Sequence, residues 1–216
     1  MLEYKGLKIS WLGHAGFKIT DGKTIYIDPY QIKGEGEADL LLITHEHFDH
    51  LSLEDIKKIA SEKTVVITTP MAEPQLAKLK VKEVKTVKPG DRVDVEGVTV
   101  EAVPAYNLDK FRSPGRVFHP KEDGKVGFVL TFQGAKIYHA GDTDAVPEMK
   151  DIQPDIALLP VSGTYVMTAV EAAEAVKLLK PKLAVPMHYG SIVGDEEDAK
   201  KFKETASCDV QILSKE

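Results

Sequence analysis

Cysteine is almost absent from this sequence, since Cys208 is the only one among 216 residues. A lone cysteine cannot form an intramolecular disulfide, and it supplies no group of thiolates for a metal cluster. A reducing compartment is the simplest interpretation. A metal site in this chain would have to be built from imidazoles and carboxylates.

Long apolar stretches are missing as well. No run approaches the ~20 apolar residues that a bilayer-spanning helix needs. Residues 1–6 also lack the apolar core of a signal peptide. We therefore expect a cytoplasmic protein that does not associate with a membrane.

Positive charge is in short supply, because 28 Lys and Arg residues face 34 Asp and Glu residues, giving a net charge of −6. Binding to a phosphate backbone depends on clustered basic side chains that release counterions. Nucleic acid is therefore not an expected partner, and we expect a small-molecule substrate instead. A homo-oligomer stays open.

The sequence also lacks linkers, because no Pro-rich, Ser-rich or low-complexity tract divides it. Its 43% hydrophobic and 29% charged residues are ordinary for a folded protein. A chain of this length buries enough surface to fold without disulfides. We predict a single domain over residues 1–216.

Apolar and β-branched runs bounded by turn residues predict the strands. Helices are predicted after Ser52, over residues 169–180 behind a Thr168–Glu171 capping box, and over residues 195–206. Strands with interspersed helices, without strict alternation, favour an α/β (α+β) fold with helices packed outside sheets. The predicted strands are 7–12, 17–20, 24–28, 40–44, 65–68, 98–103, 126–132, 135–139, 156–160, 183–187 and 210–213.

Residues 45–50 hold three of the seven histidines together with two acids. We expect the strand to continue through residues 44–47, which would point His45 and His47 the same way, while a turn redirects Asp49 and His50. Imidazoles and carboxylates without thiolates suit zinc, with a position left open for water. The alternative is a solvated polar turn whose histidines cap the following helix.

Residues 44–50, Thr-His-Glu-His-Phe-Asp-His, resemble the metallo-β-lactamase superfamily, whose signature is His-x-His-x-Asp-His. Asp28, Asp142 and His188 follow in the order that family shows. Residues 11–17, Trp-Leu-Gly-His-Ala-Gly-Phe, are similar to the branch that contains L-ascorbate-6-phosphate lactonase. The resemblance implies a four-layer αββα sandwich with metals at one sheet edge.

The resemblance also implies two divalent metal ions, with Zn²⁺ as the expected metal and Mn²⁺ or Fe²⁺ as alternatives. Asp49 would in addition orient the nucleophilic hydroxide, and Asp28 would support the ligands. The implied ligands are His45 and His47 for one ion, Asp49, His50 and His188 for the other, and Asp142 as the bridge.

The sequence departs from the family at the third histidine of the first ion, where Asn107 follows the strand that ends near Val103. We predict that His119 supplies this ligand and that Asn107 is a weak ligand or a hydrogen-bonding partner. His14 is predicted as a second catalytic residue, with a structural role as the alternative. His139 is expected to support the site or the core.

The implied function is a hydrolase in which a metal-bridged hydroxide cleaves a small ester, lactone or phosphodiester. The loop over residues 107–124 is basic, which indicates either an anionic substrate or a merely solvated loop. Residues 162–165 either border the site or form a plain turn. The basic side chains of the loop are Lys110, Arg112, Arg116 and Lys121.

Two other functions compete with hydrolysis. A di-iron or manganese redox protein of the same fold would be expected to carry Glu where His47 stands. A metal-stabilised binding module without turnover is conceivable because Asn107 occupies the place of a ligand. The sequence does not encode the leaving group.

Overall fold

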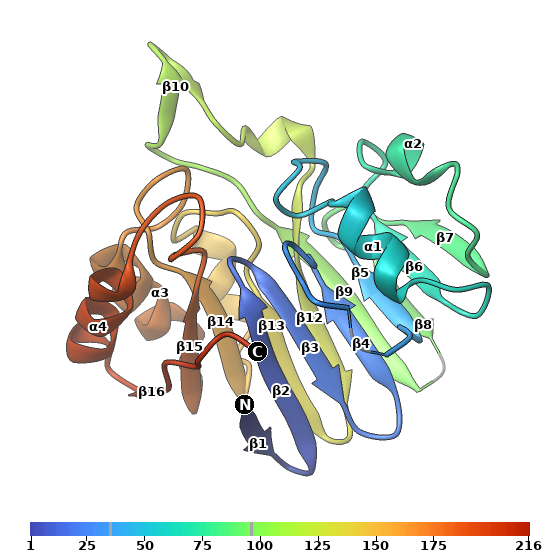
Figure 1. Cartoon of the computed structure of the whole chain (residues 1–216). Helices are drawn as coiled ribbons and strands as arrows, with labels where there is room; N and C mark the ends of the chain where they lie inside the picture. The colour runs from blue at the N-terminus through green and yellow to red at the C-terminus, as the bar shows by residue number, and fades with distance from the viewer. Residues whose placement is uncertain (35, 96) are drawn as a thin grey trace. The chain divides into compact units, whose positions relative to one another are not determined.

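The computed structural model describes residues 1–34, 36–95 and 97–216 (Figure 1). It consists of two compact units. The first unit comprises Met1–Lys88 with Leu213–Glu216, and the second comprises Pro89–Ile212. Each unit is built on one seven-stranded sheet. The single domain over residues 1–216 stays a prediction.

The sheet of the first unit follows the chain order from β1 to β7. Strands β1 to β4 are antiparallel, and β5, β6 and β7 are added in parallel. The strands are β1 (Leu2–Tyr4), β2 (Leu7–Gly13), β3 (Gly16–Thr20), β4 (Thr24–Ile27), β5 (Leu40–Leu42), β6 (Val65–Thr68) and β7 (Glu83–Thr86). A short helix, α2 (Glu73–Leu76), lies between β6 and β7.

Helix α1 (Leu53–Ile59) begins where the capping pattern predicts, because the Ser52 hydroxyl accepts a hydrogen bond from the Asp55 backbone N–H. Its acidic first turn and basic last turn also suit the helix dipole. Ile56 and Ile59 belong to one buried cluster with Leu41 and other sheet residues. This packing fixes the position of α1 against the sheet, and α1 follows the histidine-rich segment at residues 45–50 directly in the chain.

The prediction that the strand continues through residues 44–47 is wrong. Strand β5 ends at Leu42, and Ile43 makes the last backbone bond to the neighbouring segment, from its N–H to the Ile67 carbonyl. The Thr44 N–H donates instead to the Asp28 carboxylate at 2.8 Å. The orientation of His45 and His47 is therefore set by side-chain contacts and not by strand alternation.

The sheet of the second unit has the order β16-β15-β14-β13-β12-β9-β8. Strands β8, β9, β12 and β13 are antiparallel, and β13 to β16 are parallel. The strands are β8 (Arg92–Val95), β9 (Val98–Pro104), β12 (Val126–Phe132), β13 (Ala135–His139), β14 (Ile156–Pro160), β15 (Leu183–Met187) and β16 (Asp209–Val210).

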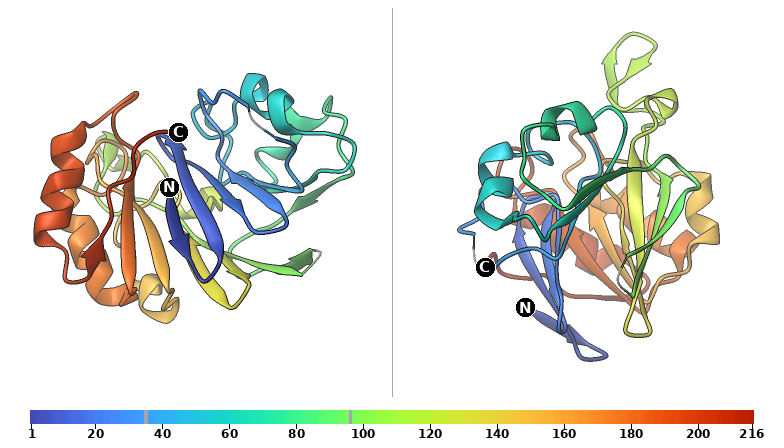
Figure 2. Two further views of the ribbon diagram at one scale, coloured as in Figure 1. Left: turned by 60° about the horizontal axis from the view of Figure 1, so that its bottom comes forward. Right: turned by 90° about the vertical axis from the view of Figure 1, so that its right-hand side faces the viewer.

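Helices α3 (Ala169–Leu179) and α4 (Glu196–Thr205) lie side by side against this sheet (Figure 2). Helix α3 opens with the predicted capping box, in which Thr168 and Glu171 each accept the other's backbone N–H. A short 3₁₀ helix, η2 (Pro147–Asp151), also contacts α3. Among the described residues, no helix combines the length and apolar character that crossing a membrane requires.

Other predictions need correction in this unit. The last strand is shorter than residues 210–213, since only Asp209–Val210 pairs with β15. The loop over residues 107–124 contains structure of its own, a hairpin of β10 (Phe111–Ser113) with β11 (Arg116–Val117) and the 3₁₀ helix η1 (Lys121–Asp123). The exposed, polar sequence of this hairpin gives no period-2 apolar signal.

Candidate metal centre

The first unit places His45 and His47 next to each other, with His45 Nε2 3.1 Å from His47 Nδ1. Two nitrogens that share a tetrahedral zinc ion at about 2.05 Å lie ~3.3 Å apart, so this spacing suits a common ion. The Thr44 hydroxyl donates to Asp28 at 2.6 Å and lies 3.0 Å from His45 Nδ1. It therefore accepts from Nδ1–H, which leaves the His45 Nε2 lone pair facing His47.

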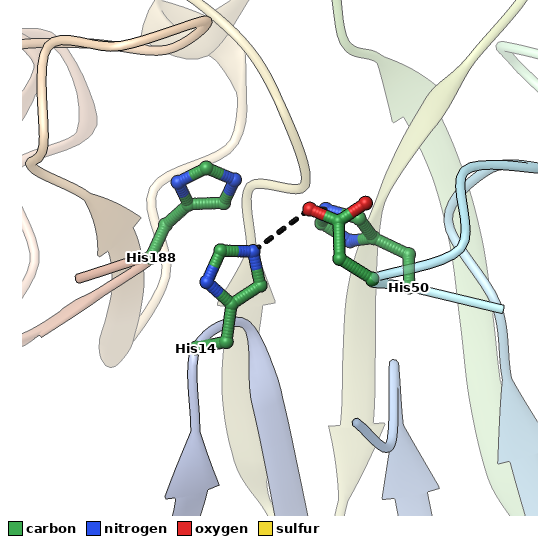
Figure 3. A group of neighbouring side chains, drawn as sticks. His14, His50 and His188 are labelled. Carbon is green, nitrogen blue, oxygen red and sulfur yellow. Dashed lines mark hydrogen bonds and ion pairs between the residues drawn. The ribbon is translucent and has the colours of Figure 1, made fainter. Parts of the chain in front are cut away.

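A second group in the same unit consists of His14, Asp49 and His50, whose potential ligand atoms lie within 4.8 Å of one another. His14 Nε2 is 2.9 Å from Asp49 Oδ2, the contact drawn as a dashed line in Figure 3. His50 Nε2 is 3.6 Å from the same oxygen. The predicted catalytic pair, Asp49 and His14, is thus in direct contact.

Asp28 anchors both groups. Its carboxylate is fully buried and accepts hydrogen bonds from the Thr44 N–H at 2.8 Å and from the Thr44 hydroxyl at 2.6 Å. The same carboxylate lies 2.8 Å from His50 Nδ1. A carboxylate at Nδ1 keeps the proton there and turns Nε2 toward Asp49, as in many metal-bound histidines. Asp28 therefore occupies the supporting place that the resemblance implies.

Three predicted site residues adopt a left-handed backbone that L-residues rarely use. These are His14 (φ 51°), Asp28 (φ 42°) and, in the second unit, His188 (φ 61°). Such conformations carry strain of about 1–3 kcal/mol each and tend to occur at functional sites. His14 is held there by a hydrogen bond from Trp11 Nε1 to its carbonyl at 2.9 Å.

The second unit gathers two imidazoles around Asp142. His188 Nε2 lies 3.2 Å from Asp142 Oδ1, and His119 Nε2 lies 3.6 Å from Oδ2. Each carboxylate oxygen thus faces a different histidine. The two imidazoles and the carboxylate together form a donor set that could hold divalent cations.

Close backbone packing positions the turn that carries Asp142. A Cβ atom at Gly127 on β12 would lie 2.7 Å from the carbonyl oxygens of both His139 and Ala140, so only glycine allows this approach. The Gly141 N–H donates to His139 Nδ1 at 3.2 Å. His139 is buried and holds the turn, in agreement with its predicted supporting role.

Uncharged groups anchor the two histidines of the second unit that are predicted ligands. Asn107 Oδ1 lies 3.0 Å from His119 Nδ1, and Ser162 Oγ lies 3.2 Å from His188 Nδ1. Of the two roles predicted for Asn107, the structure shows the hydrogen bond to His119. Ser162, in the segment predicted to border the site or form a plain turn, contacts a predicted ligand.

The basic loop is less available to a substrate than its sequence indicates. Lys110 lies 2.9 Å from Glu171 and 3.5 Å from Asp144, and Lys121 lies 2.6 Å from Glu148. Burial alone would lower the pKa of Lys110, but its hydrogen bonds and charges outweigh this effect and raise the pKa. The other two basic residues, Arg112 and Arg116, lie on the exposed hairpin.

Sequence reasoning missed two residues that organise the site. One is Thr44, which links Asp28 to His45. The other is Asp144, which accepts the backbone N–H of Leu108 at 2.6 Å and of Asp109 at 3.2 Å. Their positions beside the His45 motif and beside Asp142 were the only signals available.

The donor set fits divalent metal ions, because it combines imidazole nitrogens with carboxylates at spacings that suit shared cations. Residues 8–188 match the Beta-lactamase superfamily domain. The chain belongs to the beta-lactamase superfamily. This match confirms the predicted family on most of the chain.

Relatives in this superfamily are named metal-dependent hydrolases. A UPF0173 metal-dependent hydrolase of Methanopyrus kandleri is 33% identical over 226 residues, covering 96% of each chain. Another, from Thermoplasma acidophilum, is 36% identical over 214 residues, covering 94% of this chain and 92% of its own. These names do not favour the redox or non-catalytic alternatives.

A crystal structure described as a metal-dependent hydrolase from Parabacteroides distasonis is 35% identical. It superposes with a TM-score of 0.82 over 96% of this chain and 94% of its own. This likeness confirms the predicted mixed α/β fold of the metallo-β-lactamase type. Similarity to the ascorbate-lactonase branch stays a prediction.

Proposed function

We propose that this superfamily member is a hydrolase with a dinuclear metal centre that cleaves a small anionic ester, lactone or phosphodiester. The observation that carries the proposal is Asp142, which faces one imidazole with each of its two oxygens. Imidazole nitrogens and carboxylate oxygens gathered in this way form a donor set that suits divalent cations. The relatives named metal-dependent hydrolases support the same chemistry.

The proposed ligands keep the roles that the resemblance implies. Two bound divalent ions would supply hydroxide at neutral pH by lowering the pKa of water toward ~7 and would polarise the substrate's carbonyl or phosphoryl oxygen. The ligands are His45, His47 and His119 for one ion, Asp49, His50 and His188 for the other, and Asp142 for both.

Asp49 and His14 act together in this proposal. Donation from His14 Nε2–H, 2.9 Å from Asp49 Oδ2, holds the carboxylate in one rotamer. A fixed carboxylate orients the attacking water by accepting its hydrogen bond, which keeps a lone pair aimed at the substrate. The strained backbone of His14 fits a residue whose placement matters more than its local stability.

Zinc is the proposed metal because the donors are nitrogen and oxygen atoms without thiolates, although manganese or iron would accept the same set. The proposal that the substrate is anionic depends on Arg112 and Arg116, since the nearby lysines are paired with acids. We further propose that the protein is cytoplasmic. We also propose that it acts as one domain, because the family match extends across both units.

Metal analysis of the purified protein, followed by a substrate screen, tests this function. We expect about two metal ions per chain, and chelator-sensitive turnover of at least one class among lactones, phosphodiesters, thioesters and β-lactams. A content near zero after growth with ample zinc would refute the centre. Two ions without turnover of any substrate would favour the binding module.

A further inference from the structure

Asn107 uses its whole hydrogen-bonding capacity within the second unit. Its Oδ1 lies 3.0 Å from the His119 backbone nitrogen and 3.0 Å from His119 Nδ1. Its Nδ2 lies 2.8 Å from the Tyr165 carbonyl oxygen and 3.3 Å from Asp144 Oδ1. A carboxamide has two donors and two acceptor lone pairs, so all four are occupied. Oδ1 therefore has no lone pair left for a cation.

The orientation of this carboxamide does not depend on any assumption about His119. The Tyr165 carbonyl can only accept, so it requires the NH₂ group on its side, and the His119 backbone N–H can only donate, so it requires the oxygen. Exchanging oxygen and nitrogen would oppose both pairs. The oxygen beside His119 Nδ1 is therefore an acceptor.

An acceptor at Nδ1 determines which ring nitrogen of neutral His119 carries the proton. The proton stays on Nδ1, and the Nε2 lone pair then points toward Asp142 Oδ2, 3.6 Å away. Both residues are buried, which limits competition from water for these bonds. Asp144 holds the other end of the carboxamide and is itself bound by the Leu108 N–H at 2.6 Å.

We propose that Asn107 is a positioning residue that selects the Nδ1–H tautomer of His119 and fixes its ring with Nε2 ready to bind a metal ion. The inference rests on the proposed function only in taking His119 as a ligand. This role explains the departure from the family pattern. Asn107 stands where the family has a histidine ligand, and it orients His119, the histidine that we propose as the ligand instead.

The tautomer is measurable in metal-free protein by long-range ¹H–¹⁵N correlation of labelled histidines at about pH 8, above the ordinary histidine pKa of ~6.5. His119→Gln identifies the signal by its loss. We expect Nδ1–H in the wild type and a shift toward Nε2–H in Asn107→Ala. Asn107→Asp retains an acceptor oxygen and should keep Nδ1–H, although it places a second carboxylate beside Asp144.

Metal affinity provides a second readout, by competition with a chromophoric chelator. Loss of a partner that orients a ligand typically lowers affinity ~10–100-fold, which we expect for Asn107→Ala, against a few-fold change for Asn107→Asp. Glu148→Ala is the matched control, because it removes the partner of Lys121 and of the Tyr106 hydroxyl, close in sequence to His119 and Asn107, without touching the ring or the carboxamide. We expect it to alter neither readout.

The outcomes separate the two proposals. Nε2–H in the wild type, or an unchanged tautomer and affinity in Asn107→Ala, would overturn the role of Asn107. Should the wild type show Nδ1–H yet bind no metal, the pairing would stand and the proposed function would fail. If Asn107→Asp does not fold, the wild-type tautomer and the Asn107→Ala result still decide.

Discussion

In the first unit, four predicted ligands lie within six consecutive residues, from His45 to His50, and a buried carboxylate, Asp28, supports them. In the second unit, the predicted ligands come from three separate segments, at His119, Asp142 and His188. The partners of its two predicted histidine ligands are an amide and a hydroxyl.

This difference affects both recognition and energetics. A compact motif is visible in a sequence, whereas dispersed ligands depend on the fold to bring them together. A buried carboxylate also makes stronger hydrogen bonds than a neutral oxygen. Its removal therefore costs more free energy of folding, because its buried partners lose a stronger hydrogen bond. We therefore expect the first unit's support to be the more sensitive to substitution.

The largest effects are expected from removing one ligand in each unit. His45→Ala and Asp142→Ala should each lower turnover by more than ~100-fold and reduce the bound metal, since losing a ligand costs more than losing its supporting partner. Metal content and kcat/KM of the purified variants measure this. Normal activity in either metal-washed variant would contradict the site assignment.

Many of the strands of both units could be predicted from the sequence, but not all of them. Strands with continuous apolar runs, such as β12 (Val126–Phe132) and β14 (Ile156–Pro160), were predicted with their observed bounds. The polar strand β7 (Glu83–Thr86) was missed because only Val84 is apolar. Periodicity cannot reveal such a strand.

The candidate site shows the same limit. The cluster at residues 45–50 is recognisable because its members are close together in the sequence. Strand alternation, however, predicts the wrong cause for its geometry, which is set by the contacts of Thr44 and Asp28. The roles of Asn107 and His119 stayed open because they depend on contacts with Tyr165 and Asp144. Those contacts link segments up to 58 residues apart, which spacing does not report.

A pair of supporting residues sharpens the comparison between the units. Asp28→Ala should lower the free energy of unfolding by about 3 kcal/mol, because Thr44 and His50 lose a charged acceptor in a buried place. Ser162→Ala should cost about 1 kcal/mol, because the lost partner is a neutral hydroxyl. Urea unfolding of the metal-free variants compares them, and equal losses would remove the distinction.

Smaller effects are expected from Asp55 of the first unit. Burial would raise its pKa, but hydrogen bonds from Lys58, Ser52 and the N–H groups of Gln31 and Ile32 outweigh it and lower the pKa. A folded pKa below the unfolded value of ~3.9 stabilises the fold above that value, and this contribution is lost as pH falls through the folded pKa.

The measurement for Asp55 is the Tm of the wild type and Asp55→Asn as a function of pH. The wild type should be the more stable near neutral pH, and the gap should narrow as the pH falls below ~3.9 toward the folded pKa. A gap that stays constant down to the lowest pH would show that shape, and not the carboxylate charge, is what the position requires.

The smallest effect is expected in the core of the second unit, where two tyrosines differ in their partners. The Tyr138 hydroxyl is fully buried on β13 and has no hydrogen-bond partner among the described residues, and burial raises its pKa. The Tyr106 hydroxyl, by contrast, donates to Glu148 at 3.0 Å.

Removing a hydroxyl that lacks a partner relieves its desolvation, so Tyr138→Phe should leave the free energy of unfolding unchanged or raise it by up to ~1 kcal/mol. Tyr106→Phe should lower it by about 1 kcal/mol, because a hydrogen bond to a carboxylate is lost. Urea midpoints compare the two variants. A loss for Tyr138→Phe as large as that for Tyr106→Phe would require an acceptor beside the buried hydroxyl, and would show that this core depends on a polar contact at Tyr138.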